Sequence, residues 1–464
     1  MIWIGGALAA SVTLNPGDDV ASLTSSLGPG DEVVFNAGTY ELSSSLYWAD
    51  IEGTEADPVV VRGEGEAVIK LVESGSRILE VDRASWLEIS NLTFTADGEG
   101  WEEWSTTALN LEDTSNLVIE DCTFEHLDAH AIVLAGDTTG AVIRGNDITD
   151  INGHGLYAGC SDVSCWLQGS TIEQNWFHGL NWDSSWAIYL EHGAQDNVIR
   201  DNVMYDLGYR GVHLGSTELG PPNVFEGNAI WGVESIALYV AGSSVVRNNL
   251  VFNTGERGIY TGDSSDRGTF TELVISHNTI VDTGWWGIYL EHWAEGEGMV
   301  LANNVISNPT GYALTTEEEE GDISEANYIQ ANVVTGLVWG EFDELAGHFQ
   351  AGFGSQDFVD APGWNFYPAD GSSLVGQADP SGSAWVPEVD FNDYPRDGAS
   401  PDVGAYERSG GENPGWAIQE GFKVPGYDDS GETQQVGGCC NEGDGEPAAA
   451  FLLVPLLGLV VRRR

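Results

Sequence analysis

Positively charged residues are scarce in this sequence. Its 464 residues include 16 Lys and Arg against 73 Asp and Glu, which gives a formal net charge of −57. A protein with so negative a field repels phosphate backbones, and this excludes nucleic-acid binding. The charge also counts against polyanionic glycans unless Ca²⁺ neutralises the binding surface. It is equally typical of an adaptation to solubility or high salt that involves no partner.

Cysteine is scarce as well, with five residues in the whole chain. Cys160 and Cys165 bracket the segment CSDVSC and are predicted to close a small disulfide, as in exported proteins. Cys122 falls at a core position of the sequence repeat and is predicted to be a buried thiol. No Cys-x-x-Cys pair is joined by a second pair or by histidines, so a structural zinc site is not supported. Cys439 and Cys440 lie side by side near the C-terminus.

Helical periodicity is also missing from the body of the chain, whereas a repeat of about 26 residues is clear. Each repeat has an asparagine, with an apolar residue three positions before it and another two positions after it. The side-chain amide of this asparagine can form hydrogen bonds to the backbone of a tight turn and to the asparagine of the next repeat. This satisfies polar groups that the corner would otherwise bury unpaired. The recurring position is occupied by Leu92, Cys122, Asn146, Asn175, Asn202, Asn228, Asn249, Asn278, Asn304 and Asn332.

Each repeat also carries a second short strand, such as AIYL at 187–190 and GIYL at 287–290. The second and fourth residues of these strands are mostly apolar and are predicted to point inward, while the third points outward. Short strands, Gly and Asn turns and this period predict a parallel β-solenoid, because one coil cannot bury its apolar side without its neighbours. The outward position is occupied by Val133, Tyr157, Tyr189, His213, Tyr239, Tyr260 and Tyr289.

These repeats resemble the right-handed parallel β-helix family with PbH1 repeats, the fold of pectate lyases and many surface glycan enzymes. The resemblance implies an all-β, single-stranded right-handed parallel β-helix (solenoid) of roughly 10–12 coils with an N-terminal cap. Residues 27–46 resemble the opening of β-helix polysaccharide lyases, where a capping helix leads into the first coil. Residues 390–407 resemble the closing segment of bacterial β-helix surface proteins. We therefore expect one domain over 15–408, although this fold hosts lyases, hydrolases, epimerases and adhesins alike.

Both ends of the chain suggest export. Residues 1–10 (MIWIGGALAA) are predicted to be an export signal; because no basic residue precedes the apolar run, either the signal is truncated or the true start of the chain lies further upstream. Residues 409–438 are rich in Gly, Pro, Asp and Glu and are predicted to be a flexible linker. Residues 439–464 resemble the MYXO-CTERM class of bacterial sorting signals, with a Cys motif, a short hydrophobic helix and an Arg cluster. The resemblance implies processing and cell-surface display through Cys439 or Cys440. A plain C-terminal membrane anchor is the alternative.

The outward column of the second strands is a candidate binding surface. We call Tyr157, Tyr189, His213, Tyr239, Tyr260 and Tyr289 the tyrosine column. Coils stack about 4.8 Å apart, so its six rings would form a ribbon about 25 Å long. Aromatic faces bind the C–H-rich surfaces of sugars, and tyrosine adds a hydroxyl, so the ribbon matches an elongated polysaccharide. The alternative is that stacked tyrosines only stabilise the sheet, as β-propensity favours.

Ionisable residues gather at the edges of this column. Glu191 and Glu291, each followed by His, stand two residues beyond a tyrosine, and Arg210 and Arg257 stand three residues before the outward position. Either the two arginines belong to a site, or each pairs with a neighbouring carboxylate. The candidate catalytic residues are Arg210, His213 and Glu191, and the candidate substrate-binding residues are Tyr157, Tyr189, Tyr239, Tyr260, Tyr289, His192 and Arg257.

A lyase mechanism is incomplete in this sequence. The chondroitinase B and alginate lyase group, which the N-terminal segment resembles, uses Lys and Arg with Ca²⁺ for β-elimination. Here the chain has only Lys70 and Lys423, and neither belongs to the central coils. His213 or Tyr189 could serve as the base with Arg210 as the cation, since both residue types are reasonable bases.

The signs of a hydrolase and of a metal site are also incomplete. Glu191 and Glu291 are predicted to be four coils, or about 19 Å, apart, whereas glycosidase carboxylates are about 5–9.5 Å apart. The string Gly-His-Gly at 153–155 resembles a polygalacturonase motif, but the clustered aspartates of that family are not evident. Asp263 and Asp266 could bind Ca²⁺ in a loop. No nonapeptide Ca²⁺ repeat and no Asp-Pro-His epimerase string is present.

The sequence therefore predicts an exported, cell-surface β-helix protein that binds an extended polysaccharide along a Tyr-lined face. The first alternative is a polysaccharide lyase or glycoside hydrolase, and the second is a structural surface protein or adhesin. Ca²⁺ is the one cofactor considered, and membrane contact is expected only through the C-terminal segment.

Overall fold

The computed structural model describes most of the chain. The described residues are 9–20, 27–72, 77–96, 106–160, 164–181, 184–216, 220–262, 271–293, 296, 298–316, 323, 326–340, 349–382, 385–421 and 423. The chain divides into two units, Met1–Tyr427 and Asp428–Arg464. The second unit, with Cys439, Cys440 and the apolar C-terminal run, lies outside the described residues, as do Asp263 and Asp266. Within the described ranges no helix is long and apolar enough to cross a membrane.

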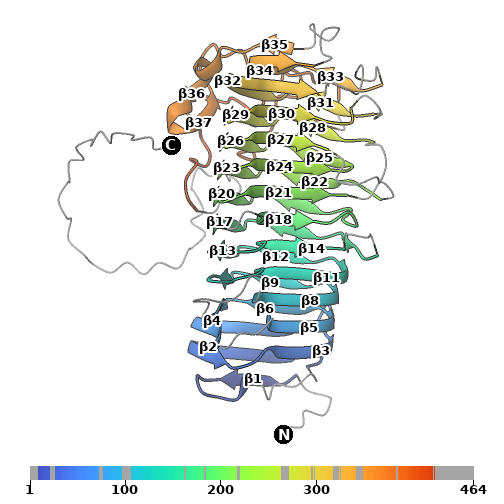
Figure 1. Ribbon diagram of the computed structural model, residues 1–464, viewed down its shortest axis with the longest axis vertical. Helices are drawn as coiled ribbons and strands as arrows, with labels where there is room; N and C mark the ends of the chain where they lie inside the picture. The colour runs from blue at the N-terminus through green and yellow to red at the C-terminus, as the bar shows by residue number, and fades with distance from the viewer. Residues whose placement is uncertain are drawn as a thin grey trace, which may run out of the picture. The chain divides into compact units, whose positions relative to one another are not determined.

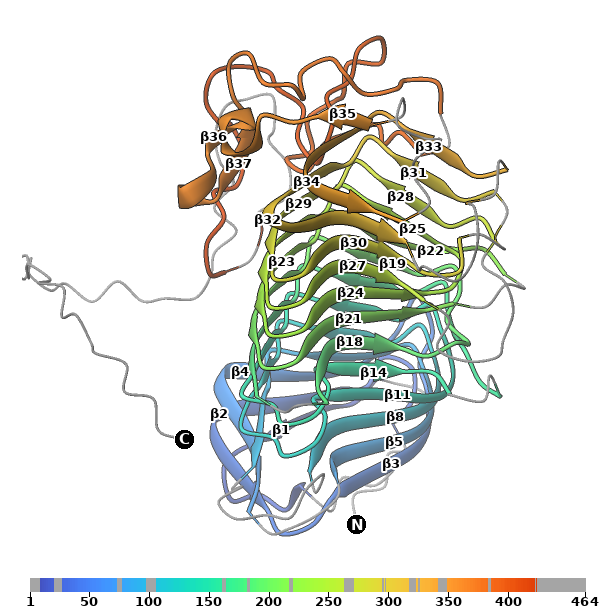
Figure 2. The same cartoon turned by 45° about the horizontal axis from the view of Figure 1, so that its top comes forward.

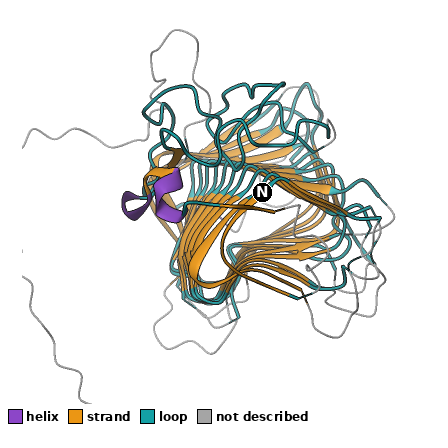
Figure 3. Cartoon of the chain, turned by 90° about the horizontal axis from the view of Figure 1, so that it is seen from above, coloured by secondary structure: helices purple, strands orange, loops and turns teal. Residues whose placement is uncertain are grey.

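The first unit is an all-β, right-handed parallel β-solenoid of about ten turns, as the repeats predict. Its coils stack from β1 to β35 in Figure 1. Each coil contributes one strand to each of three parallel sheets, which are seen end-on in Figure 3. Strand β1 (Ser11–Leu14) pairs with β2 (Glu32–Leu42), which pairs with β4 (Val59–Leu71). The segment that resembles a lyase opening thus contributes strand β2, and residues 21–26 just before it lie outside the description.

The three sheets are defined by their strands. The first sheet contains β3 (Leu46–Glu52), β5 (Arg77–Ser85), β8 (Thr107–Ser115), β11 (Ile132–Thr139), β14 (Leu156–Ala158), β18 (Trp186–Leu190), β21 (Arg210–Gly215), β24 (Ile236–Ala241), β27 (Arg257–Thr261), β30 (Trp286–Leu290) and the end of β32 (Val305–Thr316). The second contains β6 (Leu87–Ser90), β9 (Val118–Glu120), β12 (Val142–Arg144), β16 (Thr171–Glu173), β19 (Val198–Arg200), β22 (Asn223–Glu226), β25 (Ser244–Arg247), β28 (Val274–Ser276), β31 (Val300–Ala302) and β33 (Tyr328–Gln330). The third contains β7 (Thr93–Ala96), β10 (Thr123–Phe124), β13 (Asp147–Thr149), β17 (Trp176–Leu180), β20 (Val203–Leu207), β23 (Ala229–Val233), β26 (Leu250–Thr254), β29 (Thr279–Thr283), the start of β32, β34 (Asn332–Trp339) and β35 (Phe349–Ala351). Strand β15 (Leu167–Gln168) pairs with the end of β11.

The repeated asparagines form a buried ladder at the corner between the second and third sheets. Each amide nitrogen, from Asn146 to Asn304, donates to the side-chain oxygen of the asparagine one coil further on, at 2.9–3.1 Å. The same oxygen also accepts the backbone N–H of the preceding asparagine, as between Asn228 and Asn249 at 2.9 Å. The residue before each recurring position of the repeat has a left-handed backbone, with φ of 52–67° from Asn91 to Ala331. This tight turn is the corner that the sequence predicts.

An alternating row of charges runs up the outside of the second sheet. Adjacent strands place Glu120, Arg144, Glu173, Arg200, Glu226 and Arg247 in register. The pairs are joined at 2.5–2.8 Å between guanidinium and carboxylate. Three of the scarce arginines are thereby neutralised in a purely structural role.

A C-terminal segment, described at residues 352–382, 385–421 and 423, folds back along the third sheet. It includes the 3-10 helices η3 (Gly354–Asp357) and η4 (Ala361–Gly363) and the antiparallel strands β36 (Phe358–Asp360) and β37 (Asn365–Pro368), seen beside the last coils in Figure 2. Its apolar residues, such as Phe366 and Tyr406, form a second core with Trp231 and Phe252 of the third sheet.

The same segment also bonds to the asparagine corner, one coil after another. Asn303 pairs reciprocally with the backbone of Asp379, at 2.8 and 3.0 Å, and Lys423 reaches Asp201 at 2.6 Å. Trp416 and Lys423 are buried, so the start of the predicted 409–438 linker belongs to the folded body.

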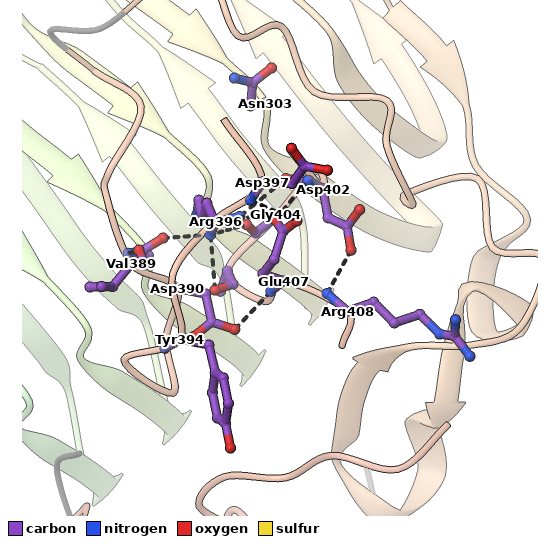
Figure 4. Close-up of polar contacts among 12 residues, drawn as sticks. Asn303, Val389, Asp390, Tyr394, Arg396, Asp397, Asp402, Gly404, Glu407 and Arg408 are labelled. Carbon is purple, nitrogen blue, oxygen red and sulfur yellow. Dashed lines mark hydrogen bonds and ion pairs between the residues drawn. The ribbon is translucent and has the colours of Figure 1, made fainter. Parts of the chain in front are cut away.

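The closing motif at 390–407 is a buried polar clasp, drawn in Figure 4. Arg396 donates to Asn248 at 2.7 Å and to the Gly404 carbonyl at 2.8 Å. Asp390 and Glu407 accept backbone N–H groups within the segment. A cavity of about 430 Å³ adjoins this clasp. The cations that line the cavity, Arg200, Arg247 and Lys423, all pair with carboxylates. We therefore interpret the cavity as a gap between the C-terminal segment and the solenoid.

Candidate functional site

The tyrosine column lies on the outer face of the first sheet in the predicted register. Successive strand pairings from β14 to β30 place its members directly opposite one another. Neighbouring ring centroids are 4.3–5.6 Å apart, and all neighbours except His213 and Tyr239 are stacked. Five of the six side chains are half-buried, whereas His213 is only 2% exposed. The column is therefore a continuous partly exposed row of rings.

The stacking corrects the expected mode of sugar contact. The coil spacing holds the ring planes within 8–29° of one another at the stacked pairs. The ring faces are therefore turned toward neighbouring rings, and the edges and polar atoms are turned outward. A ligand on this column would meet hydroxyl groups and ring edges, and the C–H-to-face contact that the sequence suggests is wrong for these rings.

Two tyrosine–glutamate pairs bracket the centre of the column. The Tyr157 hydroxyl donates to Glu191 Oε1 at 2.9 Å, and the Tyr260 hydroxyl donates to Glu291 Oε2. Burial, followed by the bond to the carboxylate, raises the pKa of both tyrosines. A Cβ at Gly262 would lie 2.7 Å from Glu291 Oε2, so glycine makes room for this carboxylate. Four strand steps separate β18 from β30, so the two glutamates do not form one catalytic couple.

His213 is buried within the column. Its Nδ1 donates to the Leu190 carbonyl oxygen at 2.8 Å, and its ring stacks on Tyr189 at 4.3 Å. Burial lowers the pKa of His213 to about 4, so the imidazole is neutral near pH 7. His192, also buried, meets it edge-to-face at 5.9 Å. No hydrogen bond joins His213 to Glu191 in the described set.

Two further histidines extend this surface toward the N-terminus. The rings of His130 and His154 stack at 4.9 Å, and His154 also stacks on Tyr189 at 5.2 Å. Burial lowers the pKa of His130 to about 4 and that of His154 to about 3. The Nδ1 atoms accept backbone N–H groups of His154 and Trp186. These neutral rings, one of which belongs to the Gly-His-Gly string, therefore bond to the backbone of the neighbouring strands.

Arg210 and Arg257 differ from every other arginine that the structure describes. The other eight each approach a carboxylate within 4 Å, namely Arg62, Arg77, Arg83, Arg144, Arg200, Arg247, Arg396 and Arg408. Arg210 instead lies over Tyr209 and Trp186, at 4.2 and 5.0 Å from the ring centroids. Arg257 lies over Tyr260 and Trp286, at 4.6 and 4.9 Å.

The guanidinium groups of Arg210 and Arg257 are not neutralised by a carboxylate of the described residues. Neither forms an ion pair or hydrogen bond with a described residue, and the Nε atom of each is buried without a partner. The alternative that each arginine pairs with a neighbouring carboxylate is therefore wrong within the described residues. Aromatic rings hold both cations in place beside the tyrosine column through cation–π contacts.

Three exposed aromatic residues were missed by the sequence analysis. Trp285 is 52% exposed, Trp339 is 42% exposed and Tyr312 is 37% exposed. Tyr312 pairs with Trp286, and Trp339, at the end of β34, pairs with Thr315 of β32, so the end of β34 continues the first sheet. These rings extend the surface at the C-terminal end of the first sheet. The Trp285-Trp286 doublet was the only signal, because the repeat pattern ends before Trp339.

The cysteines and candidate metal ligands complete the predicted residues. Cys160 and Cys165 form a disulfide with Cα atoms 5.4 Å apart, and Cys122 is a buried thiol whose pKa burial raises to about 12. Among the described residues, no group of three or more His, Cys, Asp or Glu side chains is arranged to hold a metal ion.

The sequence matches the family described as right handed beta helix region over residues 76–235 and 184–333, which together cover more than half of the chain. The chain belongs to this family. No curated protein matches the sequence.

Three solved structures show the same fold at low identity. A mannuronic acid specific polysaccharide family 6 lyase from human gut microbiota has a TM-score of 0.53 at 16% identity and covers 73% of this chain and 84% of its own. The pectate lyase Pel9A has a TM-score of 0.52 at 12% identity, covering 87% and 98%. The A-module of Azotobacter vinelandii mannuronan C-5 epimerase AlgE6 has a TM-score of 0.50 at 15% identity, covering 67% and 87%. At these identities the likeness concerns the fold alone.

Proposed function

We propose that this protein binds an extended polysaccharide along the outer face of its first sheet. The carrying observation is the pair Arg210 and Arg257, which have no carboxylate partner among the described residues of a chain whose net charge is −57. A guanidinium presents five N–H donors in a planar fork. These donors suit the hydroxyl and carboxylate oxygens of sugars.

The surrounding surface supports this proposal. The tyrosine column offers ring edges along a straight path parallel to the solenoid axis, and Glu191 and Glu291 add acceptors beside it. Exposed rings at Trp285 and Trp339 can contact sugar faces at one end. The similar structures are named for mannuronic acid polymers and pectate, which is consistent with a polysaccharide as partner.

The test is retention of the full chain on immobilised neutral and uronic polysaccharides, with and without Ca²⁺. We expect retention by at least one glycan, and a loss of about a hundredfold or more in affinity when Arg210→Gln and Arg257→Gln are combined, because hydrogen bonds from charged groups contribute about 1.5–3 kcal/mol each. Arg144→Gln is the matched control, since that arginine is committed to Glu120 on the second sheet. Equal retention of the double variant and the control would refute the proposed surface.

A polysaccharide lyase is the second candidate. Arg210 and His213 lie on one strand, β21, and the depressed pKa keeps the His213 imidazole neutral near pH 7, with one ring nitrogen unprotonated but only weakly basic. The same incubations are therefore read for ultraviolet absorbance of unsaturated ends and for new reducing ends. Unsaturated ends that disappear in His213→Gln would establish a lyase, and reducing ends alone would establish a hydrolase. Retention without products leaves a binding protein, and no response to any glycan favours a structural surface protein.

We also propose surface display, on sequence grounds alone. Residues 439–464 combine Cys439 and Cys440, an apolar run and three terminal arginines. Expression with and without this segment, followed by cell fractionation and surface labelling, tests the assignment. Identical distribution of the two forms would contradict it.

A further inference from the structure

The first sheet carries side chains in mirror order about strand β24. In the column before the tyrosines, the order along five coils is Trp186, Arg210, Ile236, Arg257 and Trp286. In the column beyond the tyrosines, the order is Glu191, Gly215, Ala241, Gly262 and Glu291. In these two columns the outer two coils therefore match each other, and so do the inner two, whereas the tyrosine column itself has His213 on one inner coil and Tyr260 on the other.

The arginine contacts follow the same mirror order. Each arginine lies against the tryptophan of the adjacent outer coil, at 5.0 Å for Arg210 and 4.9 Å for Arg257. The bonds to the outer glutamates do not follow it, because Glu191 accepts from Tyr157 of β14, outside the five coils, whereas Glu291 accepts from Tyr260 of β27. The likeness therefore extends to the way in which the two guanidinium groups are held.

Charge follows the same order along the axis. The outer coils carry carboxylates, the inner coils carry guanidinium groups without an ion-pair partner in the described part of the chain, and the central coil carries the uncharged Ile236 and Tyr239. Glycine at 215 and 262 leaves the inner coils without a side chain beyond the tyrosine column. A ligand that crosses all five coils meets two cationic positions separated by one neutral coil.

We propose that these five coils form one site with two equivalent cationic contacts, and that Arg210 and Arg257 bind two acid groups of a single glycan chain at once. This inference rests on the proposed function. The arginines are two coils, or about 10 Å, apart. An extended 1,4-linked sugar chain advances by about one residue per coil, so the contacts fall on alternate residues.

Linking two contacts in one ligand raises affinity through effective concentration. A disaccharide can reach only one arginine, so two molecules should bind per protein, one at each inner coil. A hexasaccharide reaches both arginines, so one molecule should bind per protein, and more tightly. The change in stoichiometry with length is a readout that a single-arginine site would not give.

Isothermal titration calorimetry of the full chain tests this inference with oligomannuronates of two, four and six residues. For the hexasaccharide, we expect Arg210→Gln and Arg257→Gln each to weaken binding by about tenfold or more. For the disaccharide, each variant should reduce the stoichiometry from two to one and leave the affinity of the remaining contact within about twofold. Arg144→Gln should match the wild type at every length.

The outcomes separate this inference from the proposed function. If the wild type binds one disaccharide, or if only one arginine affects the hexasaccharide, the two-contact site is overturned while glycan binding stands. If no oligosaccharide and no polysaccharide of the panel binds the folded wild type, both are overturned. Circular dichroism of each variant confirms that the strands are intact.

Discussion

His277 makes the attachment of the C-terminal segment sensitive to acid. It occupies the left-handed corner position of its coil, with φ of 54°, and its side chain is fully buried. Neither ring nitrogen has a hydrogen-bond partner. Burial, and then the nearby charges of Arg396 and Arg247, hold the pKa of His277 well below its usual value. The neighbouring Ser276 bonds to the Trp385 carbonyl at 2.7 Å, so the segment covers this corner.

The direction of the pH effect on stability follows from proton uptake by the unfolded chain. Below a pH of about 6.5 the unfolded histidine takes up a proton that the folded protein excludes. Stability is therefore present above that pH and is lost as the pH falls. The loss is about 1.4 kcal/mol per pH unit, or about 2.5 kcal/mol between about pH 7.5 and about pH 4.5. The raised pKa values of Asp390, Asp402 and Glu407 act in the opposite sense, since these carboxyls favour the folded state as they protonate.

Unfolding by guanidinium chloride, followed for the wild type and His277→Asn at about pH 7.5 and about pH 4.5, measures this loss of stability. Asparagine tolerates the left-handed backbone, as Asn248 and Asn303 show in the same column. We expect the variant to lose about 2.5 kcal/mol less than the wild type on acidification. His126→Asn is the control, because His126 has the same φ of 54° and an exposed side chain. Equal acid losses in wild type and His277→Asn would refute the argument.

Three further predictions concern the frame of the site. Asn249→Ala removes five hydrogen bonds of the asparagine ladder and should destabilise the protein by about 3–5 kcal/mol in thermal or chemical unfolding. The control is Asn253→Ala, at an exposed left-handed turn, which should cost only about 1 kcal/mol. Similar losses of stability in the two variants would contradict the role of the ladder. Tyr157→Phe should cost about 1–2 kcal/mol and reduce glycan retention, and an unchanged unfolding midpoint would show that the bond to Glu191 is not stabilising. Cys160→Ser opens a short loop and should cost about 2 kcal/mol; full stability of that variant, or of wild type under reducing agent, would argue against a stabilising disulfide.

The solenoid was predictable because its contacts are periodic. The bond from Asn228 to Asn249 joins residues that are one repeat apart, so the spacing in the sequence is the spacing in space. For the same reason the register of the tyrosine column was predicted residue by residue. A single ring orientation was not predictable, because the stacking of Tyr239 on Tyr260 depends on how side chains fill a fixed coil separation.

The sequence by itself therefore determined the coil, its asparagine corner and which side chains face outward together, since each of these repeats with the coil. Only the tertiary structure decided which of the scarce arginines are neutralised and which are available. Arg396 meets Asn248 across 148 residues, and Lys423 meets Asp201 across 222. Such contacts have no period, and they arise only when a non-repeating segment folds back on the finished coil. Among the described residues, Arg210 and Arg257 lie over aromatic rings and have no carboxylate partner, which depends on packing between coils and not on any single stretch of sequence.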